Sequence, residues 1–391
     1  MLNTTPLARK TLTHNLRRLL AALAGVGFAV VLMFMQTGFR QALYDSTVKI
    51  ITDLDADLLL VNSVQHALPA RQTFPYQRIL QAGACPGVMG VYPLYIEFNF
   101  ATLKPEGKKP HPIRVIGFHL DDPVFLAPEV RRQIDALRRP NTALIDQRRK
   151  AKYDIPYDLD EMQRQRGVEL ADREVRFVGA FPMGTDFAND GNIVMSAENF
   201  AQYFPFRSIG EDPLASVDLG VVKLQPGADP AEVQQELRQR FAGTETAVYT
   251  KHELIAKEKA FWAKSTPIGY IFGIGTIMGF VVGVIICYQV IYSGIADQMA
   301  EFATLKAMGY RNRYFVGLVL QTAFYLSVIS YVPGLLVGLA MYGLLASGTG
   351  LLLDLTLQQA VQIYAFTLGM CVLSGCLAMR KVLAADPADL F

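Results

Sequence analysis

The sequence predicts an α+β membrane protein with four transmembrane helices and a large periplasmic α/β domain between the first and second of them. The 391 residues are 51% hydrophobic and 18% charged, with mean hydropathy +0.24. That composition is too apolar for a typical soluble protein and too polar for a wholly embedded one. Four long apolar runs are present, whereas residues 40–264 contain no comparable run. The chain therefore combines a membrane part with one large soluble part.

The first apolar run, residues 19–38, carries no charge within it and is long enough to cross roughly 30 Å of hydrocarbon. The basic segment 1–18 precedes it, which predicts a cytoplasmic N-terminus. A cleaved signal peptide is the alternative. The apolar core is long for a signal peptide, however, and no small-residue cleavage site follows it. We therefore expect a retained first span.

The remaining spans alternate with short loops that differ in charge. Basic residues mark the N-terminal segment, the second loop and the C-terminal segment, while the short loop before the last span has Asp354 as its only charge. The positive-inside rule then predicts a multi-pass inner-membrane protein with both termini in the cytoplasm. The third run exceeds the roughly 20 residues that a span needs, so it tilts, projects beyond the membrane or breaks, and we expect the break at Pro333-Gly334. The predicted order after the first span is a periplasmic domain (39–266), spans 267–292, 314–345 and 358–379, a cytoplasmic loop (293–313), a periplasmic loop (346–357) and a cytoplasmic tail (380–391).

The two ends of the soluble domain look alike. Residues 56–100 and 217–250 each read as strand, helix and strand, which indicates a split ferredoxin-like lobe. The insertion at 112–213 has short apolar runs, and we expect it to form a mostly-β lobe. Helical continuations of the first span to about residue 51 and of residues 249–264 into the second span would form a stalk. The alternative is a pair of flexible connectors.

The segment 294–313 is the only strongly polar interruption in the last third of the chain. Its apolar residues recur every three or four positions, so they predict one stripe of a short helix. Gly309 follows directly and suits a left-handed cap. Such a helix between two spans can receive motion from a soluble partner, or it can lie on lipid headgroups as an ordinary loop. The stripe consists of Ile295, Met299, Phe302, Leu305 and Met308.

The run from Glu301 to Gly309, EFATLKAMG, resembles the segment after the second span in MacB/FtsX-type ABC transporter permeases. The closing residues 385–390, ADPADL, resemble the D-P-A ending of that family. With the overall layout, the likeness covers the whole chain. Within the family, the length and general character are most similar to the cyanobacterial DevC group.

The resemblance implies a permease subunit that converts ATP-driven motion of a separate ABC ATPase into motion of its outer lobes. It implies that the split lobe is porter-like and that the inserted lobe is a smaller β lobe. It implies export in the MacB manner, with a periplasmic adaptor (membrane fusion protein), an outer-membrane channel of TolC type and, for a DevC-like system, glycolipid cargo. An FtsX-like or lipoprotein-releasing permease is the alternative within the family, and a non-transporting membrane sensor or scaffold is the alternative outside it. The residues expected to contact the ATPase are Met299, Glu301, Phe302, Leu305, Lys306, Met308 and Gly309.

The sequence offers little for catalysis. The chain has no G-x-x-x-x-G-K-[ST] motif to cradle ATP phosphates, so we expect it to bind no cofactor, with ATP and Mg²⁺ on the partner ATPase. Its five histidines lack zinc-protease spacing and no G-x-S-x-G motif occurs, which makes a membrane-bound enzyme the weakest hypothesis. Asp53, Asp55 and Asp57 alternate, but they lack the glycine and glutamate of a calcium loop, and we expect a solvated turn and no metal site.

Two further expectations concern partners. The net charge is +2, which is too small for the electrostatic field of the whole chain to favour binding of nucleic acid. Small residues on the second span allow close helix approach, either between two copies of the chain or within one copy. Four transmembrane helices are few for a transport pathway, so we expect a homodimer surrounded by membrane lipid. The packing residues are Gly269, Gly273, Gly279 and Gly283.

Overall fold

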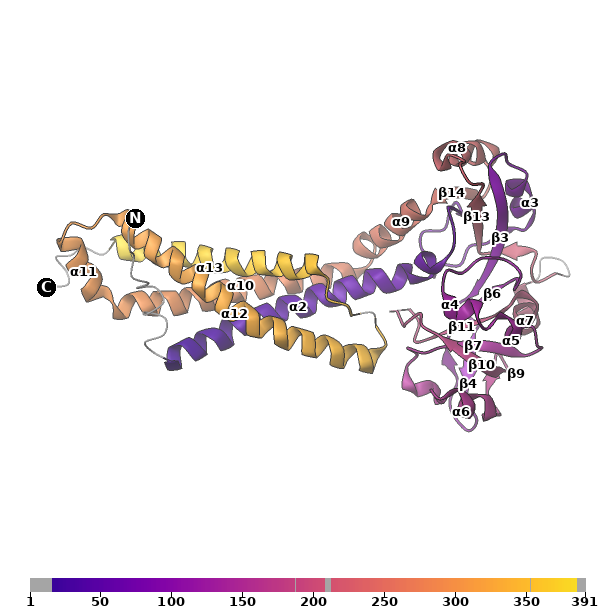
Figure 1. Ribbon diagram of the computed structural model, residues 1–391, viewed down its shortest axis with the longest axis horizontal. Coiled ribbons are helices and arrows are strands. Elements are labelled where there is room, and N and C mark those ends of the chain that lie inside the picture. Colours follow the sequence, from indigo (N-terminus) through magenta and orange to yellow (C-terminus); the bar gives the residue numbers. More distant parts are fainter. Residues whose placement is uncertain (1–15, 187, 208–211, 352, 385–391) are drawn as a thin grey trace. The chain divides into compact units, whose positions relative to one another are not determined.

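The computed structural model describes residues 16–186, 188–207, 212–351 and 353–384 (Figure 1). Its contacts divide the chain into two compact units. The membrane unit contains the described residues up to Gln41, Pro267–Leu344 and those from Leu353 onward. The outer unit contains Ala42–Thr266 together with Leu345–Leu352. The expected D-P-A ending at 385–390 lies outside the described residues.

The membrane unit consists of long apolar helices that lie side by side (Figure 1). Four helices are long and apolar enough to cross a membrane, which confirms the predicted four spans among the described residues. Their large apolar side chains are widely exposed, as expected of surfaces that lipid covers. The helices are α2 (Leu16–Asp53), α10 (Pro267–Asp297), α12 (Asn312–Thr349) and α13 (Leu357–Ala384), and the short α11 (Met299–Ala307) joins α10 to α12.

Several polar side chains in these helices bind backbone carbonyls, which satisfies their hydrogen-bonding groups within the apolar layer. The Ser374 hydroxyl of α13 donates to Val284 O of α10 at 2.7 Å. The Tyr331 hydroxyl of α12 donates to Ala360 O of α13 at 2.8 Å. Gly38 leaves room on α2 for the ring of Tyr342, which any larger residue would hit. Close packing and satisfied hydrogen bonds therefore hold the bundle together.

The predicted break at Pro333 is wrong, because α12 runs without interruption from Asn312 to Thr349. Proline removes one backbone hydrogen bond, but a membrane helix tolerates that loss where neighbouring helices pack against it. Gly334 supplies such packing, since a side chain there would meet Val30 Cγ1 at 2.7 Å. The excess length of the third run is taken up by extension of the helix beyond the predicted end of the span.

The outer unit is built on an eight-stranded sheet in the order β10-β7-β11-β6-β3-β13-β1-β14. The part β3-β13-β1-β14 is antiparallel throughout, with α3 between β1 and β3 and α8 between β13 and β14. This arrangement confirms the predicted split β-α-β lobe. The strands are β1 (Leu58–Asn62), β3 (Val88–Glu97), β6 (Arg114–Phe118), β7 (Thr142–Asp146), β10 (Arg176–Phe181), β11 (Asn192–Ser196), β13 (Leu219–Leu224) and β14 (Thr246–Thr250).

The inserted segment shares this sheet with the porter-like lobe, which no pattern in the sequence predicted. Strand β3 is long enough to pair with β13 up to Leu94 and with β6 from Leu94 onward. Strands β7, β10 and β11 of the insertion then continue the sheet beyond β6. There are also two minor sheets, β12-β2 and β5-β4-β8-β9, and the insertion contributes β8 and β9 to the second of them. Their strands are β2 (Phe74–Pro75), β4 (Thr102–Lys104), β5 (His111–Pro112), β8 (Glu169–Leu170), β9 (Arg173–Glu174) and β12 (Ser216–Val217).

Both faces of the main sheet are buried. Along β1, Leu58 and Leu60 belong to one apolar cluster, whereas Leu59 and Val61 belong to the other, because alternate residues of a strand face opposite sides. The second cluster includes Ile51 at the end of α2. The covering helices are α3 (Gln77–Gly83), α4 (Pro128–Arg131), α5 (Ile134–Leu137), α6 (Leu159–Arg164), α7 (Ala197–Tyr203), α8 (Pro230–Arg240) and α9 (Lys251–Lys264), with short 3₁₀ turns at Ala151–Tyr153 and Pro205–Arg207.

Candidate coupling sites

The segment between α10 and α12 forms the predicted short helix. Helix α11 ends at Ala307, and Gly309 adopts φ 92°, the left-handed conformation expected of its cap. The Gly309 amide donates to Lys306 O at 3.0 Å and the Tyr310 amide to Leu305 O at 3.2 Å, so both satisfy carbonyls at the end of the helix. The chain then turns sharply into α12 at Asn312.

The predicted contact residues of this segment differ in exposure. Met299, Leu305 and Lys306 are half-buried, whereas Glu301 and Gly309 are exposed. Met308 is 70% exposed because it caps the helix, although the predicted stripe placed it with buried Ile295. The side chain of Phe302 lies outside the described residues.

Tyr310 was not among the predicted contact residues, yet it is 44% exposed and packs its ring 4.9 Å from that of Tyr314. Arg311 and Arg313 follow it and are also exposed. Met308 and Tyr310 thus form an apolar tip with cations beside it, which we call the α11 tip. The sequence signal that could have identified Tyr310 is its position as an aromatic residue directly after the capping glycine.

The glycines of α10 pack mainly within the chain. A side chain at Gly279 would meet Met33 Cγ of α2 at 3.2 Å, and one at Gly283 would meet Ala29 Cβ at 3.1 Å and clash with Met370 of α13. Gly269 is half-buried. A side chain at Gly273 would meet no described atom within 4 Å.

The continuations of the first and second spans are helical, as predicted, and they are fastened together inside the outer unit. The Lys259 ammonium of α9 pairs with Asp45 of α2 at 2.9 Å. The Lys251 ammonium donates to the carbonyls of Thr52 and Leu54 at 2.9 and 2.7 Å. Lys251 therefore caps the C-terminal end of α2, where orphan carbonyls favour a cation. Thr250 starts α9 with a complete capping box to Glu253.

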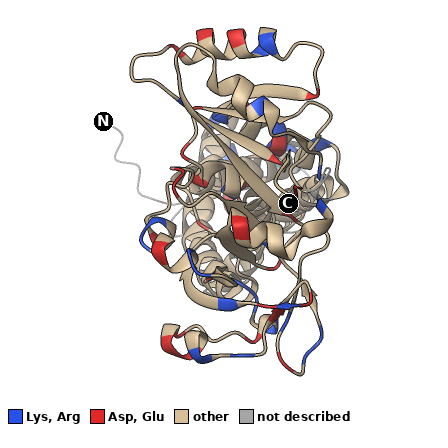
Figure 2. Ribbon diagram, turned by 90° about the vertical axis from the view of Figure 1, so that its right-hand side faces the viewer, with Lys and Arg blue, Asp and Glu red and all other residues tan. Residues whose placement is uncertain are grey.

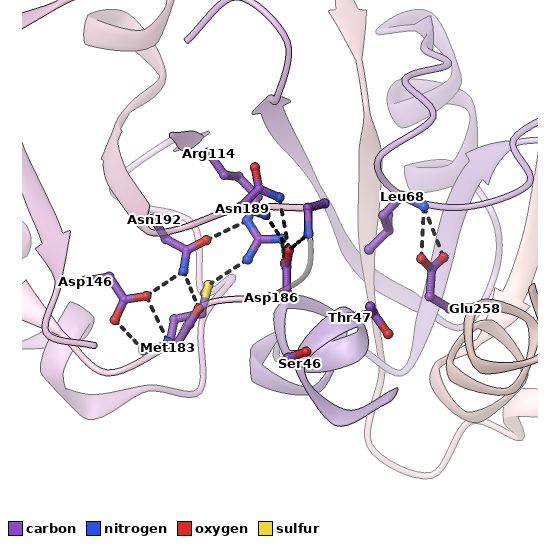
Figure 3. Close-up of polar contacts among 12 residues, drawn as sticks. Ser46, Thr47, Leu68, Arg114, Asp146, Met183, Asp186, Asn189, Asn192 and Glu258 are labelled. Atoms are coloured by element: carbon purple, nitrogen blue, oxygen red, sulfur yellow. Dashed lines mark hydrogen bonds and ion pairs between the residues drawn. The ribbon is translucent and has the colours of Figure 1, made fainter. Parts of the chain in front are cut away.

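Glu258 is a buried carboxylate on α9. Both of its oxygens accept a hydrogen bond from the Leu68 amide, at 3.0 and 3.3 Å (Figure 3). Oε1 also accepts from Trp262 Nε1 at 3.0 Å. Burial raises the pKa of Glu258 to about 7, although these hydrogen bonds favour the charged form. Glu258 thus ties α9 to the loop after β1 through a group that titrates near neutrality.

A second polar network holds the turn between β10 and β11 (Figure 3). Buried Arg114 donates to Asp186 Oδ2 at 2.8 Å and to Asn192 Oδ1 at 2.6 Å. Asp186 Oδ1 accepts from the amides of Ala188 and Asn189 at 2.8 and 2.7 Å. A buried ion pair of this kind requires that its remaining hydrogen-bond positions also be filled.

Asp146 completes this network from the end of β7. It accepts hydrogen bonds from the Met183 and Gly184 amides at 3.2 and 2.8 Å, from the Arg148 amide at 2.9 Å and from Asn192 Nδ2 at 2.5 Å. We call Arg114, Asp146, Asp186 and Asn192 the turn network. The sequence signal was weak: Arg114 is a charged residue inside an apolar strand run, and Asp146 ends another such run.

The three alternating aspartates have cationic partners. Asp55 pairs with Lys223 at 2.7 Å and with Arg131 at 3.1 Å, and Asp57 lies 3.5 Å from Lys223. Asp53 pairs with Lys49. Asp55 and Asp57 therefore hold the segment before β1 against Lys223 of β13, whereas the pair of Asp53 and Lys49 lies within α2. Figure 2 shows basic and acidic residues interspersed along the ribbon in the view that it presents.

Comparisons with known proteins agree with this architecture. A model of the MacB-like periplasmic core domain matches residues 19–240, more than half of the chain, and a model of the FtsX-like permease C-terminal region matches 273–387. No curated protein matches the chain.

Three solved structures resemble it at low identity. The periplasmic region of MacB from Actinobacillus actinomycetemcomitans has 10% identity over 50% of this chain and 89% of that chain, with TM-score 0.33. The extracellular domain of the noncanonic ABC-type transporter YknZ from Gram-positive bacteria has 13% identity over 50% and 99%, with TM-score 0.31. A domain of a permease protein from Porphyromonas gingivalis has 17% identity over 42% and 71%, with TM-score 0.28.

Proposed function

Because this chain belongs to the MacB/FtsX-type family of ABC transporter permeases, we propose that it transmits ATP-driven motion of a separate ATPase subunit to its outer unit and so drives export. Family membership implies the ABC ATPase partner and a non-catalytic role for this membrane subunit. The finer assignment is a MacB-like exporter of DevC type, with glycolipid as cargo, working with a periplasmic adaptor and an outer-membrane channel of TolC type. The layout of the chain and the resemblance of residues 301–309 support it.

The observation that carries the proposal is the α11 tip. A large apolar side chain on a membrane-protein loop, 70% exposed and flanked by cations, matches a knob that enters a groove on a soluble partner. With both termini in the cytoplasm, this tip faces the cytoplasmic ATPase, and ATP and Mg²⁺ bind there and not to this chain. Met299, Glu301, Phe302, Leu305, Lys306, Met308 and Gly309 belong to the contact surface, and Tyr310 joins them.

The proposal includes a homodimer in the inner membrane. Gly273 supports it, since no described atom fills the space beside it, and Tyr270 and Ile274 on either side are each 60% exposed. Gly269 extends the same surface by one turn. Gly279 and Gly283 serve packing within each copy.

The test of the ATPase contact uses Met308→Asp in the full chain, expressed together with the ABC ATPase proposed as its partner. We expect affinity for the ATPase to fall at least about tenfold, because a charged carboxylate in an apolar groove is poorly solvated. Met89→Asp is the matched control, since Met89 is 54% exposed on the outer unit. Co-purification in detergent and ATPase stimulation are measured. Equal retention of the ATPase by both variants would remove the α11 tip from the interface.

A further inference from the structure

The C-terminal end of α12 and the residues directly after it belong to the outer unit. Residues Leu345–Leu352 cluster with Ala42–Thr266, although the rest of α12 and α13 lie in the membrane unit. Two hydrogen bonds from one residue hold this segment. The Thr185 amide donates to Gly350 O at 3.2 Å, and its hydroxyl donates to Thr349 O at 2.9 Å. Thr185 is buried in this contact.

Gly350 occupies a position where any side chain would be strained. Its φ is 73°, in the region that favours glycine, and a side chain there would clash with the Arg148 carbonyl oxygen. The same side chain would lie 2.9 Å from Thr185 Cγ2. Gly350 is therefore enclosed between Arg148 on one side and Thr185 on the other. At Gly348, two residues earlier, a side chain would meet no described atom within 4 Å.

The residues that enclose Gly350 are themselves fixed by the turn network. Asp146 binds the Arg148 amide through Oδ1 and the Gly184 amide through Oδ2. Asp186 directly follows Thr185 and pairs with Arg114 (Figure 3). Buried charges of this kind are unfavourable unless they are fully paired, and they add little net stability. The buried charges of the turn network therefore serve to hold Arg148 and Thr185 in position on both sides of Gly350.

We propose that Thr185 and Arg148 form a clasp on residues 349–350, through which α12 and α13 act on the outer unit. The clasp is noncovalent and adds a third attachment to the two continuous connections through α2 and through α9 and α10. This inference rests on the proposed function, because it specifies where motion enters the outer unit.

The position of the clasp in the sheet gives it a mechanical role. Helices α2 and α9 adjoin β1 and β14 in the chain, at one end of the strand order. Thr185 lies between β10 and β11, and Arg148 follows β7, all three at the other end. The eight-stranded sheet is thus held at both ends. Movement of α12 and α13 relative to α2 and α10 would tilt or twist the sheet as one body.

Hydrogen exchange of the full chain in lipid nanodiscs tests the clasp itself. In the wild type, we expect the Thr185 amide to be protected. Gly350→Ala should raise its exchange rate at least about tenfold, because the hydrogen bond to Gly350 O is lost. Gly348→Ala is the matched control and should leave the rate unchanged. Thr185→Val should release residues 349–350, and Thr185→Ser, which keeps the hydroxyl, should restore them. An unprotected wild-type amide, or equal rates in the two alanine variants, would overturn the clasp.

The transmission step is tested with the ATPase bound, with and without a non-hydrolysable ATP analogue. We expect nucleotide to change exchange in residues 183–190 and in α9 of the wild type. In Thr185→Val, the ATPase should still co-purify and α9 should still respond, while the response of 183–190 is lost. A response of 183–190 that persists in this variant, or is missing from the wild type, would overturn transmission through the clasp. Failure of the wild type to bind the ATPase would instead refute the proposed function, and the nucleotide-free experiment would still decide whether the clasp exists.

Discussion

The α11 tip and the turn network are built in opposite ways. At the tip, Met308 and Tyr310 are exposed, and Arg311 beside them is exposed as well. In the turn network, Arg114 and Asp146 are buried, and their polar atoms bind partners within the same chain. The tip leaves apolar side chains exposed, whereas the polar groups of the network find their partners within the chain.

This difference indicates whether the residues of each region matter for binding or for folding. An uncovered apolar tip gains stability only when another protein covers it, so its residues matter for binding and little for folding. A buried ion-pair network is expensive to disturb, so its residues matter for the shape of the outer unit. Substitutions in the two regions should therefore separate binding from folding.

The largest expected effect is that of Arg114→Met. Removing the guanidinium leaves Asp186 buried without its cation, which typically destabilises a protein by about 3–5 kcal/mol. The outer unit should unfold at a markedly lower denaturant concentration, and fluorescence of Trp262, the one tryptophan of the sequence, should report it. Arg311→Met is the matched substitution at the exposed tip, and it should change stability by less than about 0.5 kcal/mol. Similar losses in both variants would erase the contrast between the two regions.

The next effect concerns Glu258, a buried group outside the turn network. Its folded pKa of about 7 lies above the ordinary 4.5, so the folded protein binds this proton more tightly than the unfolded chain does. Its contribution to stability is therefore full below about pH 4.5 and is lost as the pH rises through about 7. Relative to Glu258→Gln, which cannot titrate, the wild type should lose about 3 kcal/mol between pH 4.5 and 8.

Denaturant unfolding of both proteins across that pH range measures this loss. Asp218, whose pKa burial also raises, to about 6, is common to the two proteins and cancels in their difference. Lys257 and Asp186, the charged neighbours with opposite influence on Glu258, are likewise present in both. A difference that does not vary with pH would show that Glu258 keeps an ordinary pKa.

How far the sequence predicted these features depends on whether a feature is local or formed between distant segments. The four spans, the cap at Gly309 and the ferredoxin-like pairing of the outer strands follow from apolar length, one glycine and repeated strand-helix-strand order. The break at Pro333 failed because a local rule ignored the neighbouring helices, among them Val30 of α2. Met308 was placed on one apolar stripe with Ile295 because the periodicity was extended past the last turn of α11, whereas Ile295 is buried and Met308 is exposed.

The turn network and the clasp could not be found in this way. Arg114 and Asp186 are 72 positions apart, and Thr185 and Thr349 are 164 apart. No pattern in the sequence indicates which charged residue inside an apolar strand meets which turn. The join between the insertion and the porter-like lobe was hidden for the same reason, since it depends on the pairing of β3 with β6.

The smallest expected effect is that of Asp45→Asn, which removes the pair between α2 and α9 at Lys259. The side chains of Lys259 and Asp45 are 35% and 40% exposed, and exposed pairs contribute at most about 1 kcal/mol. We expect a shift in unfolding free energy below that value, and a smaller one at 1 M salt, because salt screens solvent-exposed charges. Lys259→Met should give a similar small loss, and the double variant should lose little more than either single one. A loss that approaches that of Arg114→Met would mean that this pair, although partly exposed, holds the two helices as firmly as the buried network holds its turn.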